Sequence, residues 1–382
     1  MPIEGEIVVR LARAAGRIDH VSIRSTRPLA TARVVVGRRA GDAAALVPRL
    51  YSVCARAQGA AAASALESAA GRPPSPATSA ARSLSVALEN LQEDLRRLLI
   101  DVPKAIGQAA VVEPVAEVRR AFAPVLSAAP GFTDESRASA PATRHAIDTA
   151  IAVVSRHVLG ESLAAFAARM DAEGLERWSH AATTAPARAW RAVLDRGGRL
   201  GESDVPTLPP MTREQVEILL AALAADGGFA AAPRLGGATR ETGALARMAA
   251  HPAVAGIASR HGRGVAARLA ARVADVARTA GALADGGTPA RLDAWSTASG
   301  AGVAIVETAR GLLLHCAEIR EDRVTGYAIV APTEWNFQPG GPLERSLAGL
   351  DARDAEALQH DAGLVVQSLD PCVACSIEVR DA

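Results

Sequence analysis

Aromatic residues are scarce in this sequence, since Phe, Trp and Tyr together make up only 3% of its 382 residues. A protein with so few rings must build its core from alanine, leucine and valine, and hydrophobic residues still reach 49%. Alanine has the highest helix propensity of all residues and occurs here in long runs. The composition therefore predicts a globular and mainly α-helical protein.

An excess of charge of either sign is also missing. The chain carries 42 basic and 41 acidic residues, a formal net charge of +1, and Lys104 is its only lysine. This balance provides no general attraction to nucleic acid or to a membrane surface, and we expect neither as a partner.

Long apolar runs are absent as well, because charged residues or proline interrupt every stretch before it reaches the length of a membrane span. The N-terminal residues Met1 to Glu6 include acids where a signal peptide would carry basic residues. We therefore expect a cytoplasmic protein. In that compartment its four cysteines would be reduced thiols, available for metal or redox chemistry.

The hydrophobic periodicity predicts short strands at both ends of a largely helical chain. The predicted strands are 6–13, 18–24, 30–37, 303–306, 312–319 and 324–330. The predicted helices are 49–71, 78–100 with Thr78 or Ser79 as its cap, 115–127, 143–172, 185–195, 212–225, 262–284 and 353–367. In the second of these, leucines recur at helical spacing, which indicates one apolar face.

These elements predict a mainly α fold with a small β portion. The proline-rich segment 72–76 is short enough to be a surface loop, so we expect one domain spanning residues 1–382. Its parts would be a β-containing segment 1–45, a helical body 46–300, a small β segment 303–332 and a C-terminal helix with a Cys-x-x-Cys motif in 351–382.

That motif, Asp370-Pro371-Cys372-Val373-Ala374-Cys375, is the sharpest local signal for chemistry. Two thiols three residues apart can bind one soft metal. Half of a zinc site is an alternative, although no second pair is present. A thioredoxin-like redox pair would follow a strand, whereas this motif follows a helix. Two buried apolar cysteines are the remaining alternative.

Cys54 is the second candidate, because it stands at the start of a predicted helix. Backbone N–H groups and the helix dipole at such a position favour the thiolate. A lone cysteine is normally a core residue, and we assign that role to Cys316 in its predicted strand.

Taken together, these segments resemble the large subunit of nickel–iron hydrogenases. That family carries Arg-x-Cys-Gly-x-Cys-x-x-x-His near its N-terminus and Asp-Pro-Cys-x-x-Cys-x-x-His at its C-terminus. Four further segments match in the same order: Ile3-Glu4-Gly5, Gly243 to Arg247, Glu307 to Gly311 and Val330 to Asn336. The resemblance covers both ends well and residues 110–240 poorly, and it implies the family's fold with long central helices.

The departures from the family pattern concern nickel. As the resemblance implies, Cys54 and Cys375 match the two cysteines that bridge nickel and iron, and Cys372 matches one terminal nickel ligand. Tyr51 stands where the other terminal ligand would be, and a neutral phenol is a poor replacement for a thiolate at a soft metal. Gln58 and Glu378 replace the two motif histidines. We therefore expect Cys54 and Cys375 to bind iron, with Cys372 as a capture or exchange ligand, and we expect no nickel.

The iron of that family carries two cyanides and one carbon monoxide. The resemblance implies that Arg310 donates hydrogen bonds to one cyanide and Thr333 to the other, which is sensible because a buried anion needs such donors. Ala309 replaces a family proline and is expected to loosen the loop around Arg310. Glu4 matches a proton-relaying glutamate, with a solvated carboxylate at a strand edge as the alternative.

Accessory proteins of hydrogenase gene clusters, the HupK/HoxV type, share this pattern of retained and lost cysteines. The sequence thus favours a non-catalytic maturation scaffold that receives, holds or transfers an Fe(CN)2CO unit. Its partners would be hydrogenase maturation chaperones, the hydrogenase large subunit, or both. Two alternatives stay open: a metal-free interaction module that mimics the large subunit, and a divergent hydrogenase or hydrogen sensor.

Overall fold

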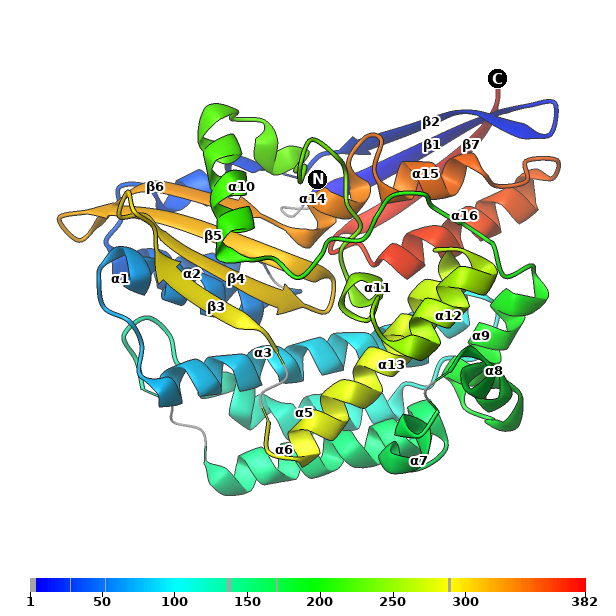
Figure 1. Cartoon of the computed structure of the whole chain (residues 1–382), viewed down its shortest axis with the longest axis horizontal. Helices are drawn as coiled ribbons and strands as arrows, with labels where there is room; N and C mark the ends of the chain where they lie inside the picture. The colour runs from blue at the N-terminus through cyan, green and yellow to red at the C-terminus, as the bar shows by residue number, and fades with distance from the viewer. Residues whose placement is uncertain (1–4, 28, 52, 136–138, 170, 288–289) are drawn as a thin grey trace.

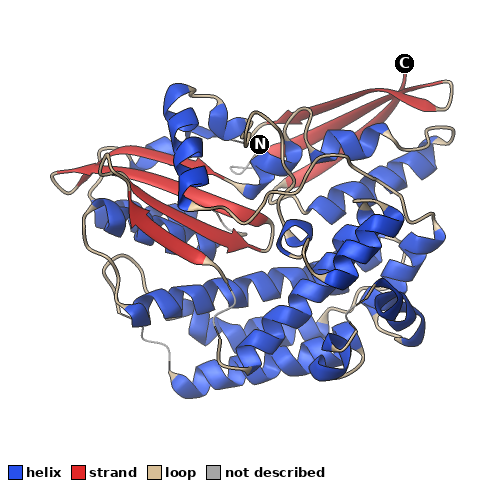
Figure 2. Cartoon of the chain, in the orientation of Figure 1, coloured by secondary structure: helices blue, strands red, loops and turns tan. Residues whose placement is uncertain are grey.

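Two β-sheets accompany a broad layer of helices in the computed structural model of the protein (Figures 1 and 2). The structure describes residues 5–27, 29–51, 53–135, 139–169, 171–287 and 290–382. The predicted class, mainly α with a small β portion, is confirmed. Of the helices described, none combines the length and the apolar character that a membrane crossing requires.

The first sheet joins the two ends of the chain. It contains β1 (Glu6–Ala14), β2 (Arg17–Ser25) and β7 (Ala374–Asp381) in the order β2-β1-β7. β1 is antiparallel to β2 and parallel to β7, with Ile7 opposite Cys375. The predicted strands 6–13 and 18–24 are confirmed, whereas β7 was not predicted.

The second sheet is an antiparallel meander of β3 (Leu292–Ser296), β4 (Gly302–Thr308), β5 (Gly311–Arg320) and β6 (Arg323–Val330). Three of these strands were predicted, and β3 lies inside the predicted helical body. Helices α1 (Ala40–Leu50) and α2 (Ala55–Ala69) pack against one face, and α10 (Arg213–Ala225) lies over the other (Figure 1).

Helix α2 is buried on all sides from Ala57 to Ser68 except at the half-buried Gly59. Its small side chains allow this, because they let the helix approach the sheet backbone closely. A Cβ atom at Gly302 on β4 would lie only 1.9 Å from the carbonyl oxygen of Ala65. Glycine at this position therefore lets the sheet and α2 come into direct backbone contact.

The helical layer is built around two long helices, α3 (Pro76–Arg96) and α13 (Val265–Ala284), which cross in Figure 1. The predicted leucine face of α3 is buried in the main core. The remaining helices are α4 (Val102–Ala105), α5 (Glu113–Ser127), α6 (Ala140–Val153), α7 (Leu163–Ala167), α8 (Ala172–Ala181), α9 (Ala185–Asp195), α11 (Ala244–Arg247), α12 (Pro252–His261), α14 (Pro332–Phe337), α15 (Pro342–Ala348) and α16 (Ala355–Leu369).

Several predicted boundaries were wrong. The segment predicted as a strand at 30–37 is a 3-10 helix, Leu29–Val35. The helix predicted from 49 to 71 is two helices, α1 and α2, separated by the residues around Cys54. The helix predicted from 143 to 172 is broken, because Gly160 adopts a left-handed conformation with φ of 73° after a π-helical turn. The cap of α3 is Ser75, whose hydroxyl accepts from the backbone N–H of Thr78.

Candidate functional site

Cys54 lies at the junction of two helices, directly before the first residue of α2. Tyr51 ends α1 on the other side of this junction. The carboxylate of Glu89, on α3, accepts hydrogen bonds from the backbone N–H groups of Arg56 at 2.8 Å and Ala57 at 2.9 Å. Glu89 therefore caps α2 and fixes where the Cys54 backbone sits.

The expectation that this position favours the thiolate was wrong. Burial raises the pKa of the Cys54 thiol to about 12, and the negative charges of Cys372 and Glu89 raise it further. Arg310 and a hydrogen bond from Gln58 oppose this rise. The helix N-terminus does not help, because Glu89 already occupies its N–H groups and adds a negative charge.

Cys372 reaches the same place from the other end of the chain. Asp370 ends α16 in a left-handed conformation, with φ of 56° and ψ of 71°, and turns the chain toward Pro371 and Cys372. The hydroxyl of Thr333, in the first turn of α14, donates to Cys372 Sγ at 3.1 Å. Cys372 is also the largest charge influence on Cys54, which puts both thiols in one buried region although more than 300 residues separate them in the sequence.

Tyr51 and Arg27 complete the surroundings of the two thiols. Burial raises the pKa of Tyr51 to about 12, so its phenol stays neutral at physiological pH. Burial lowers the pKa of Arg27, but the charges of Cys372, Glu334, Cys54 and Tyr51 raise it above its ordinary value. Arg27 also forms an ion pair with Glu334. Sequence reasoning missed Arg27, since an arginine just after a strand carries no distinguishing signal.

Gly5 is the family-like glycine that places the Arg27 backbone. Its φ of 76° lies in the left-handed region, and an added Cβ would lie 2.7 Å from the Cα atom of Arg27. The chain at Arg27 therefore passes so closely that no side chain fits at position 5. Glu4, the residue before it, lies outside the described residues.

Arg310 occupies the two-residue turn between β4 and β5, and its guanidinium is buried. Its Nη2 donates to Glu93 at 2.9 Å, and its Nε lies 3.4 Å from Asp370 Oδ1. Burial lowers the pKa of Arg310, but Asp370, Glu93, Cys372 and Cys54 raise it well above the ordinary value, so it is a permanent cation beside the thiols. Apart from this ion-pair contact with Asp370, its Nε makes no hydrogen bond to any described residue.

Side-chain hydrogen bonds hold the turn that carries Arg310 and contains Ala309. The Asn90 side chain on α3 donates to Glu307 O at 2.9 Å and accepts from the Ala309 N–H at 2.8 Å. The hydroxyl of Thr308 donates to Gly311 O at 2.9 Å across the same turn. These side chains replace the stiffness that a proline would have supplied.

Cys375 does not join this group. It lies in β7, partly buried against the main hydrophobic core together with Ile377 and Val379. Burial alone raises the pKa of its thiol to about 12, with no contribution from the other cysteines. Among the described residues, no group of three His, Cys, Asp or Glu side chains is arranged to hold a metal ion.

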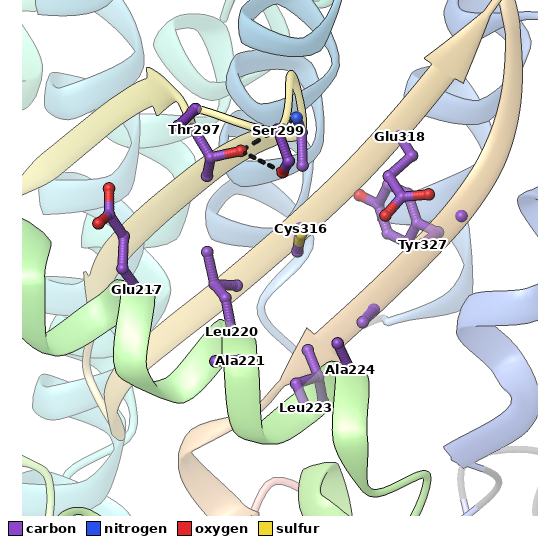
Figure 3. A pocket seen from close by; sticks show the side chains of 14 residues that line it. Glu217, Leu220, Ala221, Leu223, Ala224, Thr297, Ser299, Cys316, Glu318 and Tyr327 are labelled. Atoms are coloured by element: carbon purple, nitrogen blue, oxygen red, sulfur yellow. Dashed lines mark hydrogen bonds between the residues drawn. The ribbon is translucent and has the colours of Figure 1, made fainter.

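Cys316 faces the opposite side of the second sheet. Figure 3 shows its sulfur between α10 and the strands, in a pocket of about 480 Å³ that Leu220, Leu223 and Tyr327 also line. Cys316 is half-buried rather than a core residue, and burial raises the pKa of its thiol to about 11.

A network of buried ion pairs surrounds Asp370, the residue two positions before Cys372. Arg97 pairs with Asp370 Oδ1, and Arg272 lies 3.1 Å from its Oδ2. Arg97 belongs to the turn after α3 and Arg272 to α13, so the two long helices both hold the C-terminal segment. Burial raises the pKa of Asp370, but Arg310, Arg97 and Arg272 together hold it well below its ordinary value.

Comparison with known proteins agrees with this architecture. A family model described as nickel-dependent hydrogenase matches residues 244–378. The fold is that of the large subunit of nickel-containing hydrogenases: a solved Ni-Fe-Se hydrogenase from D. vulgaris Hildenborough superposes with a TM-score of 0.67 over 95% of each chain, at 16% identity.

Full-length relatives narrow this class further. The chain is 31% identical to the hydrogenase expression/formation protein HupK of Bradyrhizobium diazoefficiens, covering 100% of this chain and 99% of that one. It is 29% identical to the hydrogenase expression/formation protein HoxV of Cupriavidus necator, over 98% and 96% of the two chains. The chain belongs to this family of hydrogenase expression/formation proteins.

Proposed function

We propose that this protein is a non-catalytic scaffold in hydrogenase maturation, which receives, holds or transfers an Fe(CN)2CO unit. Its family membership supports the role in hydrogenase formation. The observation that carries the finer proposal is that Cys372, hydrogen-bonded to Thr333, and Arg310 are both among the groups whose charge acts on Cys54. The iron unit is cargo here, and it arrives with three strong ligands of its own.

Two thiols suit such cargo. Thiolates are soft ligands, and two of them add to the three diatomic ligands that the iron unit already carries. Both thiols must lose their protons, and the raised pKa of Cys54 means that the free protein holds it protonated. Metal binding then releases protons, so affinity is expected to fall as the pH drops.

The polar groups beside the thiols suit the cyanides. Arg310 stays charged and is buried, where its guanidinium pairs with Glu93 and Asp370. The Thr333 hydroxyl donates its one hydrogen to Cys372 and would have to turn that O–H away from the sulfur to reach a cyanide. A buried anionic ligand gains most from such donors, because it has lost its water.

Tyr51 favours an iron carrier over a nickel enzyme. The side chain stands beside Cys54 and Cys372 and stays neutral up to about pH 12. A neutral phenol competes poorly with a thiolate for nickel. Hydrogenase maturation chaperones and the hydrogenase large subunit are the proposed partners, and the cytoplasm is the proposed location.

Two cysteine pairs compete as the iron ligands, and the proposal includes a test between them. The family resemblance assigns iron to Cys54 and Cys375, whereas the charge influence of Cys372 on Cys54 supports the pair Cys54 and Cys372. Cys375 lies in β7, where it pairs with Ile7 of β1, and none of the other cysteines influences the pKa of its thiol.

The test is infrared absorption of protein purified without air from a host that contains the maturation genes. Wild type is expected to show cyanide and carbonyl bands with bound iron and little nickel. The Cys54→Ala variant should lose them. Loss in Cys372→Ala but not in Cys375→Ala would support the pair seen in the structure, and the reverse would support the pair implied by the family.

The Cys316→Ala variant is the matched control, because it removes a half-buried thiol on the far face of the second sheet. It should keep the bands. Absence of bands in wild type together with intact chaperone binding would favour the metal-free module. Stoichiometric nickel with hydrogen-dependent dye reduction would favour a hydrogenase.

A further inference from the structure

Two buried side chains and the partly buried Tyr327 form a series of hydrogen bonds that ends on Cys54. Gln58 lies one helical turn after Cys54 on α2, and its Nε2 is 3.8 Å from Cys54 Sγ. Gln58 Oε1 lies 2.9 Å from Nε2 of His315, on β5. The Nδ1 atom of His315 lies 2.8 Å from the hydroxyl of Tyr327, on β6.

The chain is shielded from water at its middle. His315 is 0% exposed and Gln58 is 2% exposed. The Tyr327 ring packs edge-on against the imidazole, with the ring centroids 5.7 Å apart and an interplanar angle of 83°. Burial lowers the pKa of His315 to about 3, so the imidazole is neutral and has one donor and one acceptor nitrogen.

Because the neutral imidazole has a partner on each nitrogen, its tautomer fixes which group donates and which accepts at every hydrogen bond of the series. If the Tyr327 hydroxyl donates to Nδ1, then Nε2 carries the proton and donates to the Gln58 oxygen. The Gln58 amide must then present its NH2 group to the sulfur. The opposite tautomer would turn the amide over and present its oxygen to Cys54, which a thiolate would repel.

We infer that His315 and Tyr327 are positioning residues, which hold the Gln58 amide so that its N–H donates to the Cys54 sulfur when that sulfur binds metal. The reason is local charge. Cys372 and Glu89 both place negative charge near Cys54, and only Gln58 and Arg310 oppose it among its strongest influences. The inference rests on the proposed function only in taking Cys54 as a metal ligand.

The first test reads the tautomer and needs no metal. Nitrogen NMR of the full chain with labelled histidine should show neutral His315 with its proton on Nε2 and a hydrogen-bonded Nδ1. In Tyr327→Phe, the Nδ1 resonance should move to the position of a nitrogen without a donor. A proton found on Nδ1 in wild type would overturn the inference, because the amide would then face the sulfur with its oxygen.

The second test measures the affinity of the cysteine site for cobalt(II), which is the only metal added. Wild type is expected to show thiolate-to-cobalt absorption, and Gln58→Leu should bind on the order of 10-fold or more weakly, as losses of supporting hydrogen bonds at metal sites do. His315→Phe should weaken binding in the same direction. Unchanged affinity in Gln58→Leu would contradict the inference.

Gln338→Leu is the matched control, because it removes another glutamine that is 2% exposed and that bonds to Pro233 O, away from the cysteines. Its cobalt affinity should equal that of wild type, so a general effect of losing a buried amide is separated from a local one. If wild type takes up no metal, the proposed function fails. The histidine spectrum then still shows which groups donate and which accept in the hydrogen bonds from Tyr327 to Cys54.

Discussion

At the scale of single residues, burial has a larger effect on the pKa of Cys54 than its position before a helix. A cysteine before a helix is expected to ionise readily, yet the neighbours of this one come from α3 and the C-terminus and include two negative groups. Cys54 therefore stays protonated until a metal displaces its proton. In the free protein this residue is a thiol rather than a reactive thiolate.

Glu89 leads to a prediction about pH. Burial raises its pKa to about 7 from 4.5, and two backbone hydrogen bonds only partly oppose this. The folded state therefore holds a proton that the unfolded state releases, so the contribution of Glu89 to the free energy of unfolding falls as the pH rises from 4.5 to about 7.

Glu89→Gln should remove this dependence, because glutamine resembles the protonated acid. Relative to wild type, the variant should gain about 3 kcal/mol of unfolding free energy across that pH range, as measured by urea denaturation. Glu113→Gln is the control, since Glu113 is 77% exposed in its pair with Arg120. A difference between wild type and Glu89→Gln that stays constant with pH would contradict the prediction.

Sequence patterns identified some site residues and not others. Cys54, Cys372, Arg310 and Thr333 stand in motifs, and the structure brings all four together. Arg27, Glu89 and His315 stand in no motif, because each reaches the site only through the packing of its own element. Of these three, only His315 has a sequence signal that could have identified it: it is a lone histidine in the otherwise apolar strand segment Leu312 to Ala317.

At the scale of elements, the contact between α2 and the second sheet is the tightest constraint. Gly302 has an ordinary negative φ, so alanine would cause no backbone strain there, yet its Cβ would lie 1.9 Å from Ala65 O and 2.3 Å from Ala69 N. Both atoms belong to backbone, which cannot turn away as a flexible side chain can.

Gly302→Ala should therefore destabilise the protein by about 3 kcal/mol or more through overpacking. It should also weaken cobalt binding, because α2 carries Cys54 at its start. Gly363→Ala is the control: Gly363 lies in α16 with open space around it, and alanine there should stabilise by about 0.5–1 kcal/mol. A Gly302→Ala variant as stable as wild type would show that the sheet and α2 can separate.

Local patterns predicted elements well where one face meets a core. The leucines of α3 and the alternation in β4 to β6 belong to such elements. The segment 30–37 has strand-like valines, but it precedes α1 as a 3-10 helix and bonds to β6 at its end, where the Gly37 N–H donates to Val324 O at 2.8 Å. β7 escaped prediction because its pairing partner, β1, lies at the other end of the chain.

At the scale of the whole molecule, Asp370 links the long helices to the site. It pairs with Arg97 after α3, with Arg272 on α13 and with Arg310 in the β4–β5 turn. Because these elements are far apart in the sequence, the network fixes where the C-terminal cysteines leave α16.

Asp370→Asn should cost about 3–5 kcal/mol of unfolding free energy, because it leaves buried arginines without their carboxylate. Asparagine tolerates the left-handed backbone, so the loss reports charge rather than strain. Since arginines hold the pKa of Asp370 below 3.8, its stabilising effect is present above that pH and disappears as the pH falls.

Asp204→Asn is the control for this prediction, because Asp204 is 67% exposed in its pair with Arg345 and should contribute less than about 1 kcal/mol. Thermal or urea denaturation measures both variants. Equal stability of wild type and Asp370→Asn would mean that the arginine network does not hold the C-terminal segment.

The sequence by itself determined the mainly helical class, the leucine face of α3, the meander near residues 303–330 and the positions of the cysteines, since periodicity and motif spacing are local properties. Only the tertiary structure decided which cysteines meet. Hydrogen bonds to β1 hold Cys375 in a strand, while Asp370 and its arginines direct Cys372 to Cys54. These contacts join residues hundreds of positions apart, and no local pattern encodes them.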